Sequence, residues 1–101
     1  MYGVIYRWRI HKGSEEKFRK AWVRGTILIG EQCPLSGGSR LHREEDGVMT
    51  AYARWPSRQA RDECFDHLSE ETRQAIKDMR ACVSEFIGES WMEITDDELK
   101  A

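Results

Sequence analysis

The chain has 101 residues, of which 40% are hydrophobic and 34% are charged, and its formal net charge is −2 at pH 7. This length fits one globular domain, and the composition excludes a disordered or fibrous chain. A slightly acidic chain implies no basic face, so we expect neither nucleic acid nor an anionic membrane as a partner. The apolar run at residues 27–29 is far too short to span a bilayer, and no signal-peptide pattern is readable, so we expect a cytoplasmic protein.

Cysteine and histidine residues are few and scattered. An odd number of cysteines without CxxC spacing argues against a disulfide framework or a zinc site and fits a reducing compartment: Cys33, Cys64 and Cys82. We expect three small apolar thiols, with a reactive Cys33 beside Pro34 as the alternative. The histidines fall on different predicted elements, so we expect no metal centre: His11, His42 and His67.

The first half of the chain predicts a strand followed by a helix. Residues 2–10 alternate, with Val4, Tyr6 and Trp8 on one face, which is typical of a strand with one apolar side. Apolar residues then recur at helical spacing over residues 14–31, with Ser14 as the expected N-cap. Gly25 in the middle of this helix indicates either close packing or a kink.

The second half predicts two more strands, a broken helix and a last strand. A loop at residues 32–39 precedes strands at 40–44 and 48–55, joined by the tight turn at Asp46-Gly47. A helix opens after Pro56, carries Ala60, Cys64, His67 and Leu68 on one face, and breaks at residues 69–71. A second helical stretch runs on through Phe86 to Gly88, and residues 91–95 form the last strand. Residues 96–101 are expected to be a flexible tail.

This order predicts an α+β fold of ferredoxin-like β-α-β-β-α-β type, with a four-stranded antiparallel sheet and its second helix broken in two. Residues 1–95 form the single domain. Both helical layers fall on one sheet face, and the opposite face, bearing Arg7, Tyr52 and Arg54, is too aromatic to be left in water. We therefore expect a homodimer through this face. Its arginines would pair across the dimer with carboxylates such as Glu44 or Glu93, or else bind an anion inside the barrel.

Two blocks resemble the antibiotic biosynthesis monooxygenase (ABM) domain. Residues 4–18 (VIYRWRIHKGSEEKF) are similar to its first strand and acidic helix start, and residues 51–60 (AYARWPSRQA), followed by His67, are similar to its third strand and next helix. The resemblance implies a dimeric α+β barrel whose pocket lies between the sheet and the helices of each subunit. Members of this family include cofactor-free oxygenases acting on phenols or quinols and haem-degrading oxygenases.

The resemblance also implies site residues. Trp55 matches the pocket tryptophan and His67 the helix histidine, while Ala51 stands where the quinone-forming members have Asn, and Tyr6 lies near an Asn of the haem-degrading members. A histidine suits the role of base, so His67 and Trp55 are the expected catalytic residues. By periodicity, Tyr6, Trp8 and Trp22 face the same layer and would line a flat aromatic pocket together with Ala51. The alternative for each is an ordinary place in the core, and for His67 a hydrogen-bonded position on its helix.

From these residues we expect an ABM-like small-molecule oxygenase that acts, without a cofactor or metal, on a flat aromatic substrate of the phenol or quinol type. The alternative is a non-catalytic ligand-binding or stress-related homodimer of the same fold, since a fold does not fix a function. Haem handling is a third hypothesis, which a shifted Soret band on haem titration would decide.

Overall fold

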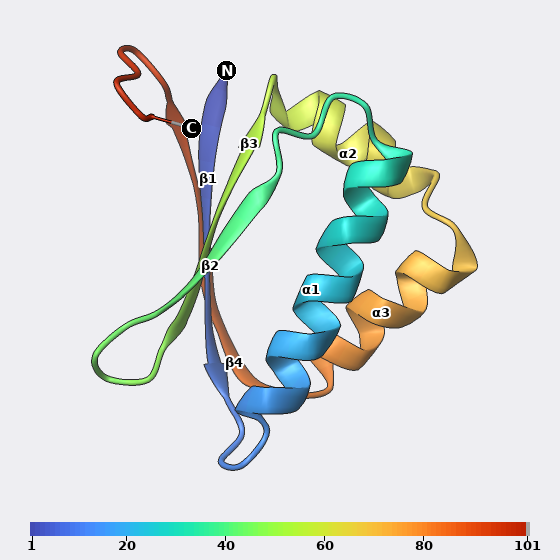
Figure 1. Ribbon diagram of the computed structural model, residues 1–101, viewed down its shortest axis with the longest axis vertical. Coiled ribbons are helices and arrows are strands. Elements are labelled where there is room, and N and C mark those ends of the chain that lie inside the picture. Colours follow the sequence, from blue (N-terminus) through green and yellow to red (C-terminus); the bar gives the residue numbers. More distant parts are fainter. Residues whose placement is uncertain (101) are drawn as a thin grey trace.

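The computed structural model describes residues 1–100 and confirms the predicted topology. A four-stranded antiparallel sheet in the order β2-β3-β1-β4 carries all three helices on one side (Figure 1). The elements are β1 (Tyr2–Ile10), α1 (Glu15–Gln32), β2 (Ser39–Arg43), β3 (Met49–Trp55), α2 (Arg58–Asp66), α3 (Glu70–Arg80) and β4 (Val83–Glu93). The second predicted helix is broken into α2 and α3. Residues 96–100 of the predicted tail lie outside helices and strands, and Ala101 falls outside the described residues.

Serine hydroxyls begin the two later helices. The Ser57 Oγ accepts a hydrogen bond from the Ala60 N–H at 3.1 Å, and the Ser69 Oγ accepts one from the Thr72 N–H at 3.2 Å. Each bond satisfies an N–H that has no partner in its first helical turn. Ser14 does occupy the N-cap position of α1, but its side chain makes no capping hydrogen bond among the described residues.

The last strand is longer than the sequence pattern predicted, and the helix before it is shorter. Val83 and Phe86, expected on a helix, instead pair with Ile10 and Trp8 of β1, and Gly88 pairs with Arg7 inside the strand. A nine-residue central strand leaves a long row of backbone groups to be hydrogen-bonded, and an eleven-residue β4 satisfies them. Two register shifts in this pairing gave the side chains a spacing that imitates a helix.

The core lies between the sheet and the helices in two clusters. One centres on Val4, Trp55 and Leu68, and the other on Trp8 and Phe18. The alternating faces of β1 and β3 supply most of these side chains, since every second residue of β3 is buried. Gly25 is buried where α1 packs on α3, and a Cβ added there would lie at an ordinary contact distance of 3.7 Å from the Ala75 Cβ.

The expectation of three unpaired thiols is wrong for two of the cysteines. Cys33, which caps the C-terminus of α1, and Cys64, on α2, form a disulfide with their Cα atoms 5.8 Å apart. The two residues are 31 positions apart, so only the chain's return through β2 and β3 brings them together. Cys82 is a free, buried thiol in the second core cluster, as predicted.

Charged side chains on the helix-free face of the sheet pair within the chain. Arg7 donates two hydrogen bonds of 3.0 Å to Glu44, which lies beside the β2–β3 hairpin turn. Arg54 pairs with Asp97 of the C-terminal segment at 3.1 Å. Glu44, which the sequence suggested as a partner for an arginine across the dimer, thus pairs with Arg7 of its own chain. Among residues 1–100, no helix is long and apolar enough to cross a membrane.

Candidate functional site

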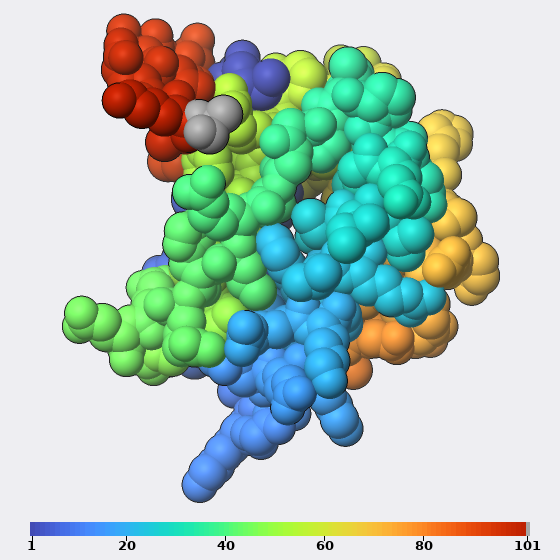
Figure 2. Space-filling model, in the orientation of Figure 1, coloured from blue at the N-terminus to red at the C-terminus, as the bar shows by residue number. Residues whose placement is uncertain are grey.

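A cavity of about 720 Å³ lies between the helix-bearing sheet face and the helices. Strands β1, β3 and β4 form its floor, and α1, α2 and α3 its walls. Figure 2 shows a narrow gap where the green segment entering β2 meets the blue-cyan surface of α1. Ser36, Ser39 and Thr26 are among the residues that line the cavity. Five of the six predicted site residues line it: Tyr6, Trp8, Trp22, Ala51 and Trp55.

Aromatic rings make the floor of the cavity flat and apolar. The rings of Tyr6 and Trp8 lie next to each other on β1, with centroids 6.0 Å apart and planes 13° apart. Trp55, only 3% exposed, meets Phe65 of α2 edge to face at 6.1 Å. Ala51 is the direct cross-strand partner of Tyr6, so a small side chain lies beside the Tyr6 ring on the cavity floor. A planar apolar ligand would find stacking surface here.

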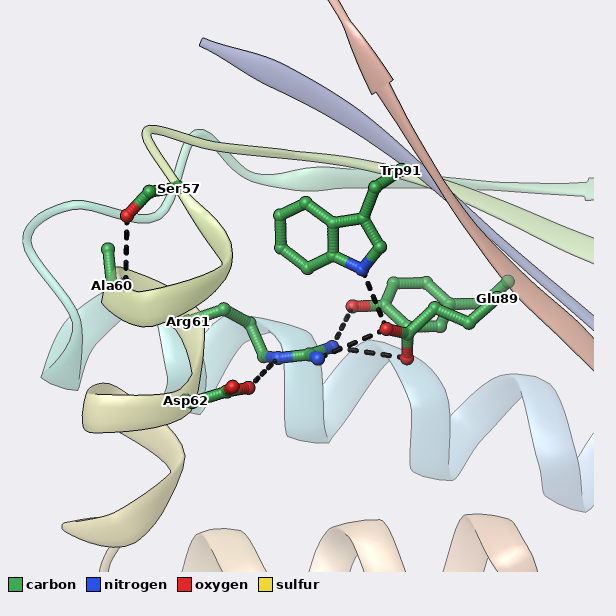
Figure 3. Close-up of polar contacts among 7 residues, drawn as sticks. Ser57, Ala60, Arg61, Asp62, Glu89 and Trp91 are labelled. Carbon is green, nitrogen blue, oxygen red and sulfur yellow. Dashed lines mark hydrogen bonds and ion pairs between the residues drawn. The ribbon is translucent and has the colours of Figure 1, made fainter.

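Arg61 of α2 forms the polar end of the cavity. Its Nη1 donates a 2.7 Å hydrogen bond to the Tyr6 hydroxyl oxygen, and its guanidinium makes a two-pronged contact with the Glu89 carboxylate at 3.2 and 3.1 Å. Asp62 accepts a further bond from Nε at 2.7 Å. Figure 3 shows the guanidinium reaching from α2 toward Glu89 and Trp91 of β4. The Arg61 side chain is only 13% exposed, so its charge is well shielded from water.

Trp91 completes this cluster from above the guanidinium. Its indole N–H donates to Glu89 at 2.7 Å, and its ring lies 5.1 Å from the Arg61 guanidinium carbon, within cation–π range. Arg58 lies 5.0 Å from the same ring but is exposed and is not part of the cavity lining. Tyr6, Glu89, Asp62 and Trp91 therefore fix the orientation of the planar Arg61 guanidinium. A fixed orientation is what its two-pronged contact with a carboxylate needs.

The charges of the cluster stabilise one another. Burial alone disfavours the charge of Glu89 and raises its pKa, but hydrogen bonds from Arg61 and Trp91 outweigh it and hold that pKa below its usual value. Burial likewise works against the Arg61 charge, while hydrogen bonds to Glu89 and Asp62 raise its pKa overall. Burial is the main cause that raises the pKa of Tyr6, so the phenol is neutral at physiological pH.

The Tyr6 hydroxyl is left with a proton to donate. It accepts a hydrogen bond from Arg61, and no hydrogen bond donated by it is found among residues 1–100. A phenol that accepts from a cation is polarised, so its own O–H becomes a better donor. Tyr6 can therefore present its proton to an oxygen of a ligand stacked on Trp8 or Trp55, with the Arg61 charge directly behind it.

The predicted core-facing position of His67 is wrong. Helix α2 ends at Asp66, and His67 is its exposed C-cap, whose N–H bonds to the Cys64 carbonyl at 3.0 Å. The residue is not part of the cavity lining. Because the helix stops before His67, the face that carries Cys64 continues instead through the buried Leu68. Its catalytic role stays a prediction that its position does not favour.

Sequence reasoning missed Arg61, Glu89 and Trp91 as one cluster. Arg61 lies three and four residues before Cys64 and Phe65, so it shares their inward face of the helix. Its position in the site could therefore have been predicted from helical spacing. Glu89 was not readable, because residues 83–88 were assigned to a helix and the strand pairing that sets Glu89 opposite Tyr6 was hidden. Among the described residues, no group of three or more His, Cys, Asp or Glu side chains could hold a metal ion.

Comparison with known proteins finds the fold in solved structures only. Neither the scan against protein-family models nor the search of curated proteins gives a match. Solved structures match over nearly the whole chain. A cofactor-independent oxygenase from Streptomyces nogalater, SnoaB, has a TM-score of 0.77 at 16% identity, covering 98% of this chain and 97% of SnoaB.

Two structures described as candidate antibiotic biosynthesis monooxygenases agree. The protein from Caulobacter crescentus CB15 has a TM-score of 0.79 at 13% identity, with 94% of this chain and 90% of that chain covered. The protein from Chloroflexus aurantiacus J-10-fl has a TM-score of 0.76 at 13% identity, with 98% of each chain covered. The chain therefore has the ferredoxin-like fold of the antibiotic biosynthesis monooxygenase structures, which confirms the resemblance in its sequence at the level of the fold.

Proposed function

We propose that this protein is a small-molecule oxygenase that oxidises a flat phenol- or quinol-type substrate with molecular oxygen and without a cofactor. The observation that carries the proposal is the pairing of Tyr6 with Arg61, at 2.7 Å, at the polar end of an aromatic cavity. The likeness to SnoaB, which is described as a cofactor-independent oxygenase, supports the same reaction class.

The chemistry asks the protein to hold an electron-rich anion in a dry site. A substrate such as an anthrone loses a proton to give an anion, which transfers electrons to oxygen and forms a hydroperoxide; loss of water then leaves a quinone. The net reaction combines the anthrone with one O₂ to give one quinone and one H₂O. Tyr6 would donate a hydrogen bond to the anionic oxygen, and Arg61 would stabilise its charge. Trp8, Trp22 and Trp55 would exclude water from the reacting face.

The lining residues restrict the substrate to one that ionises readily. No histidine lines the cavity among residues 1–100, and each of its lining carboxylates is paired with an arginine: Asp62 and Glu89 with Arg61, and Glu85 with Arg9. Arg61 also holds the pKa of Glu89 below its usual value, which makes this carboxylate a weak base. An anthrone- or dihydroxy-aromatic-type substrate fits this site, because its ring system delocalises the negative charge. A simple phenol without a second activating group fits less well.

We also propose that the protein works as a homodimer through the sheet face that bears Arg7, Tyr52 and Arg54. The arginines of this face are already neutralised within the chain by Glu44 and Asp97, which lowers the cost of burying them. The Tyr52 ring packs over Gly3, where an added Cβ would lie 2.6 Å from it, and so presents a flat aromatic surface. Light scattering at micromolar concentration should give twice the chain mass; a monomer mass would refute the dimer.

Oxygen uptake with 1,8-dihydroxyanthrone tests the enzymatic function. We expect turnover above the buffer rate in the wild type and a loss of about a hundredfold to a thousandfold in Arg61→Gln, the range for removing a charge-stabilising group. Arg58→Gln is the matched control, because Arg58 lies equally close to Trp91 but outside the cavity. Equal rates in the two variants would refute the role of Arg61.

A non-catalytic ligand-binding dimer is the second candidate. It is favoured by Ala51, which offers no polar group where the quinone-forming members have Asn, and by the absence of a lining histidine among residues 1–100. This candidate predicts that 1,8-dihydroxyanthrone binds and quenches tryptophan fluorescence without any oxygen uptake above buffer. A shifted Soret band on haem titration would instead favour haem handling.

A further inference from the structure

The disulfide between Cys33 and Cys64 joins two walls of the cavity. Cys33 ends α1 and opens the loop that brings Ser36 and Gly38 to the cavity rim, with the Ser36 N–H bonded to the Cys33 carbonyl at 3.0 Å. Cys64 lies on α2 one turn after Arg61 and next to Phe65, both of which line the cavity. The Cα separation of 5.8 Å is within the range that a disulfide spans.

Helix α2 has little else to hold it in place. It is nine residues long, and none of its residues is buried. The chain on either side is anchored better: the Trp55 side chain is buried in the core before it, and Gln32 bonds Ser69 and Thr72 after it, at 2.9 and 2.6 Å. Within α2 the attachments are the half-buried Cys64 and Phe65 side chains and the Arg61 cluster. Short segments with few buried contacts open at low free-energy cost.

We propose that the Cys33–Cys64 disulfide is a redox switch that fixes α2 over the cavity when oxidised and releases it when reduced, so that ligand affinity follows the thiol state. The proposal rests on the ligand-binding function proposed above. In the oxidised form Arg61 is held against Tyr6, and the site is preorganised for a ligand oxygen. In the reduced form α2 can move away from β1 and β4, which separates Arg61 from both Tyr6 and Glu89.

The chemistry of the switch is thiol–disulfide exchange with a low-molecular-weight disulfide such as oxidised glutathione. The Cys64 side chain is partly exposed, whereas Cys33 is only 3% exposed, so Cys64 is the sulfur that a small disulfide can reach. Its thiolate attacks one sulfur of the small disulfide and releases one small thiol; the Cys33 thiolate then attacks the mixed disulfide and releases the second. Two protein thiols become one disulfide, and the two electrons and two protons end on two small thiols.

Hydrogen exchange tests the tether itself, without any ligand. We expect the amides of α2 to exchange at least about fivefold faster after reduction by dithiothreitol, while those of β1 and β3 stay unchanged. Cys64→Ala should exchange at the reduced rate under both conditions. Cys82→Ala is the matched control, because Cys82 is buried but unpaired, and it should keep the full redox response. Equal α2 exchange in oxidised and reduced wild type would overturn the proposal.

Binding of 2-naphthol, followed by fluorescence, tests the coupling to the cavity. Couplings between two sites typically change affinity by about 5- to 150-fold, so we expect the oxidised protein to bind 2-naphthol at least about fivefold more tightly than the reduced protein. By reciprocity, saturating 2-naphthol should shift the Cys33–Cys64 equilibrium in a glutathione buffer by the same factor toward the disulfide. Equal affinities with different α2 exchange would overturn the switch but leave the ligand function standing. No binding in either form would overturn the ligand function and its regulation together.

Discussion

Replacing Tyr6 with phenylalanine removes one hydroxyl from the cavity and leaves the ring in place. Tyr6 is half-buried, and its ring stacks on Trp8 at 6.0 Å, a contact that phenylalanine keeps. The hydroxyl oxygen accepts one bond from Arg61 at 2.7 Å, and this bond is lost. Arg61 retains Glu89 and Asp62, so its charge stays paired in the variant.

The expected effects are modest for stability and larger for function. One hydrogen bond contributes about 0.5–1.5 kcal/mol net, so we expect the free energy of unfolding to fall by about 1 kcal/mol. If the Tyr6 hydroxyl also donates to the ligand, 2-naphthol should bind about 2- to 10-fold more weakly, since 1.4 kcal/mol corresponds to a factor of ten. Turnover of 1,8-dihydroxyanthrone should fall further, because the bond strengthens as negative charge develops on the substrate oxygen.

Three measurements on Tyr6→Phe separate these effects: urea unfolding, 2-naphthol titration and oxygen uptake. Ultraviolet titration supplies a fourth, because burial raises the pKa of Tyr6 above the ordinary value of about 10, and this late ionisation should disappear in the variant. Tyr2→Phe is the matched control: Tyr2 is on the same strand, meets Trp91 edge to face at 6.0 Å, and does not line the cavity.

One result would refute the assignment of Tyr6 to the site. If Tyr6→Phe lost stability as expected but bound 2-naphthol and turned over 1,8-dihydroxyanthrone like the wild type, Tyr6 would be a structural residue only. Equal losses of ligand affinity in Tyr6→Phe and Tyr2→Phe would lead to the same conclusion, because Tyr2 cannot reach the cavity.

Three further predictions concern stability. Phe18→Ala should lower the free energy of unfolding by about 3–5 kcal/mol in urea titration, because Phe18 is fully buried against Trp8; a loss below about 1 kcal/mol would contradict this packing. Gly25→Ala should raise it by about 0.5–1 kcal/mol, since the added methyl meets Ala75 at ordinary contact distance inside a helix; destabilisation would show that the contact is tighter. Glu89→Gln should flatten the acid side of the stability profile. The folded pKa of Glu89 is lowered, so its contribution is present above its unfolded pKa of about 4.3 and is lost as pH falls through the folded value; an unchanged slope in acid would contradict the Arg61 pairing.

The order of elements was predictable because the burial pattern of this chain is local and regular. Residues 2–10 were assigned to a strand with the observed bounds, and the helix assigned to 14–31 is shifted by one residue at each end. The error came in residues 83–95, where irregular pairing of β4 with β1 breaks the two-residue alternation. Val83 and Phe86 then share a helical spacing with Ile76 and Met79 of α3, and only the tertiary partner decides between the two.

The site was partly predictable for a similar reason. Tyr6, Trp8 and Trp55 face the cavity because strand alternation fixes their side, and no long-range information is needed. His67 was misplaced because its orientation depends on where α2 ends, and helix ends are set by capping rather than by periodicity. The Cys33–Cys64 pair could not be inferred from spacing, because it depends on how the C-terminus of α1 meets α2 in three dimensions.

The break between α2 and α3 explains why this small domain has room for a cavity. Helix α3 packs closely on α1 through Ala75 and Gly25, and Gln32 ties the end of α1 to the start of α3. One unbroken helix would follow α1 along its whole length and leave the sheet beside it uncovered. Ser69 restarts the helix in a new direction, so α2 is free to lie over β3 and to reach Tyr6 in the middle of β1 instead. The segment that closes the cavity is thus the one with the fewest buried residues, and the Arg61 cluster and the cysteine pair are what hold it there.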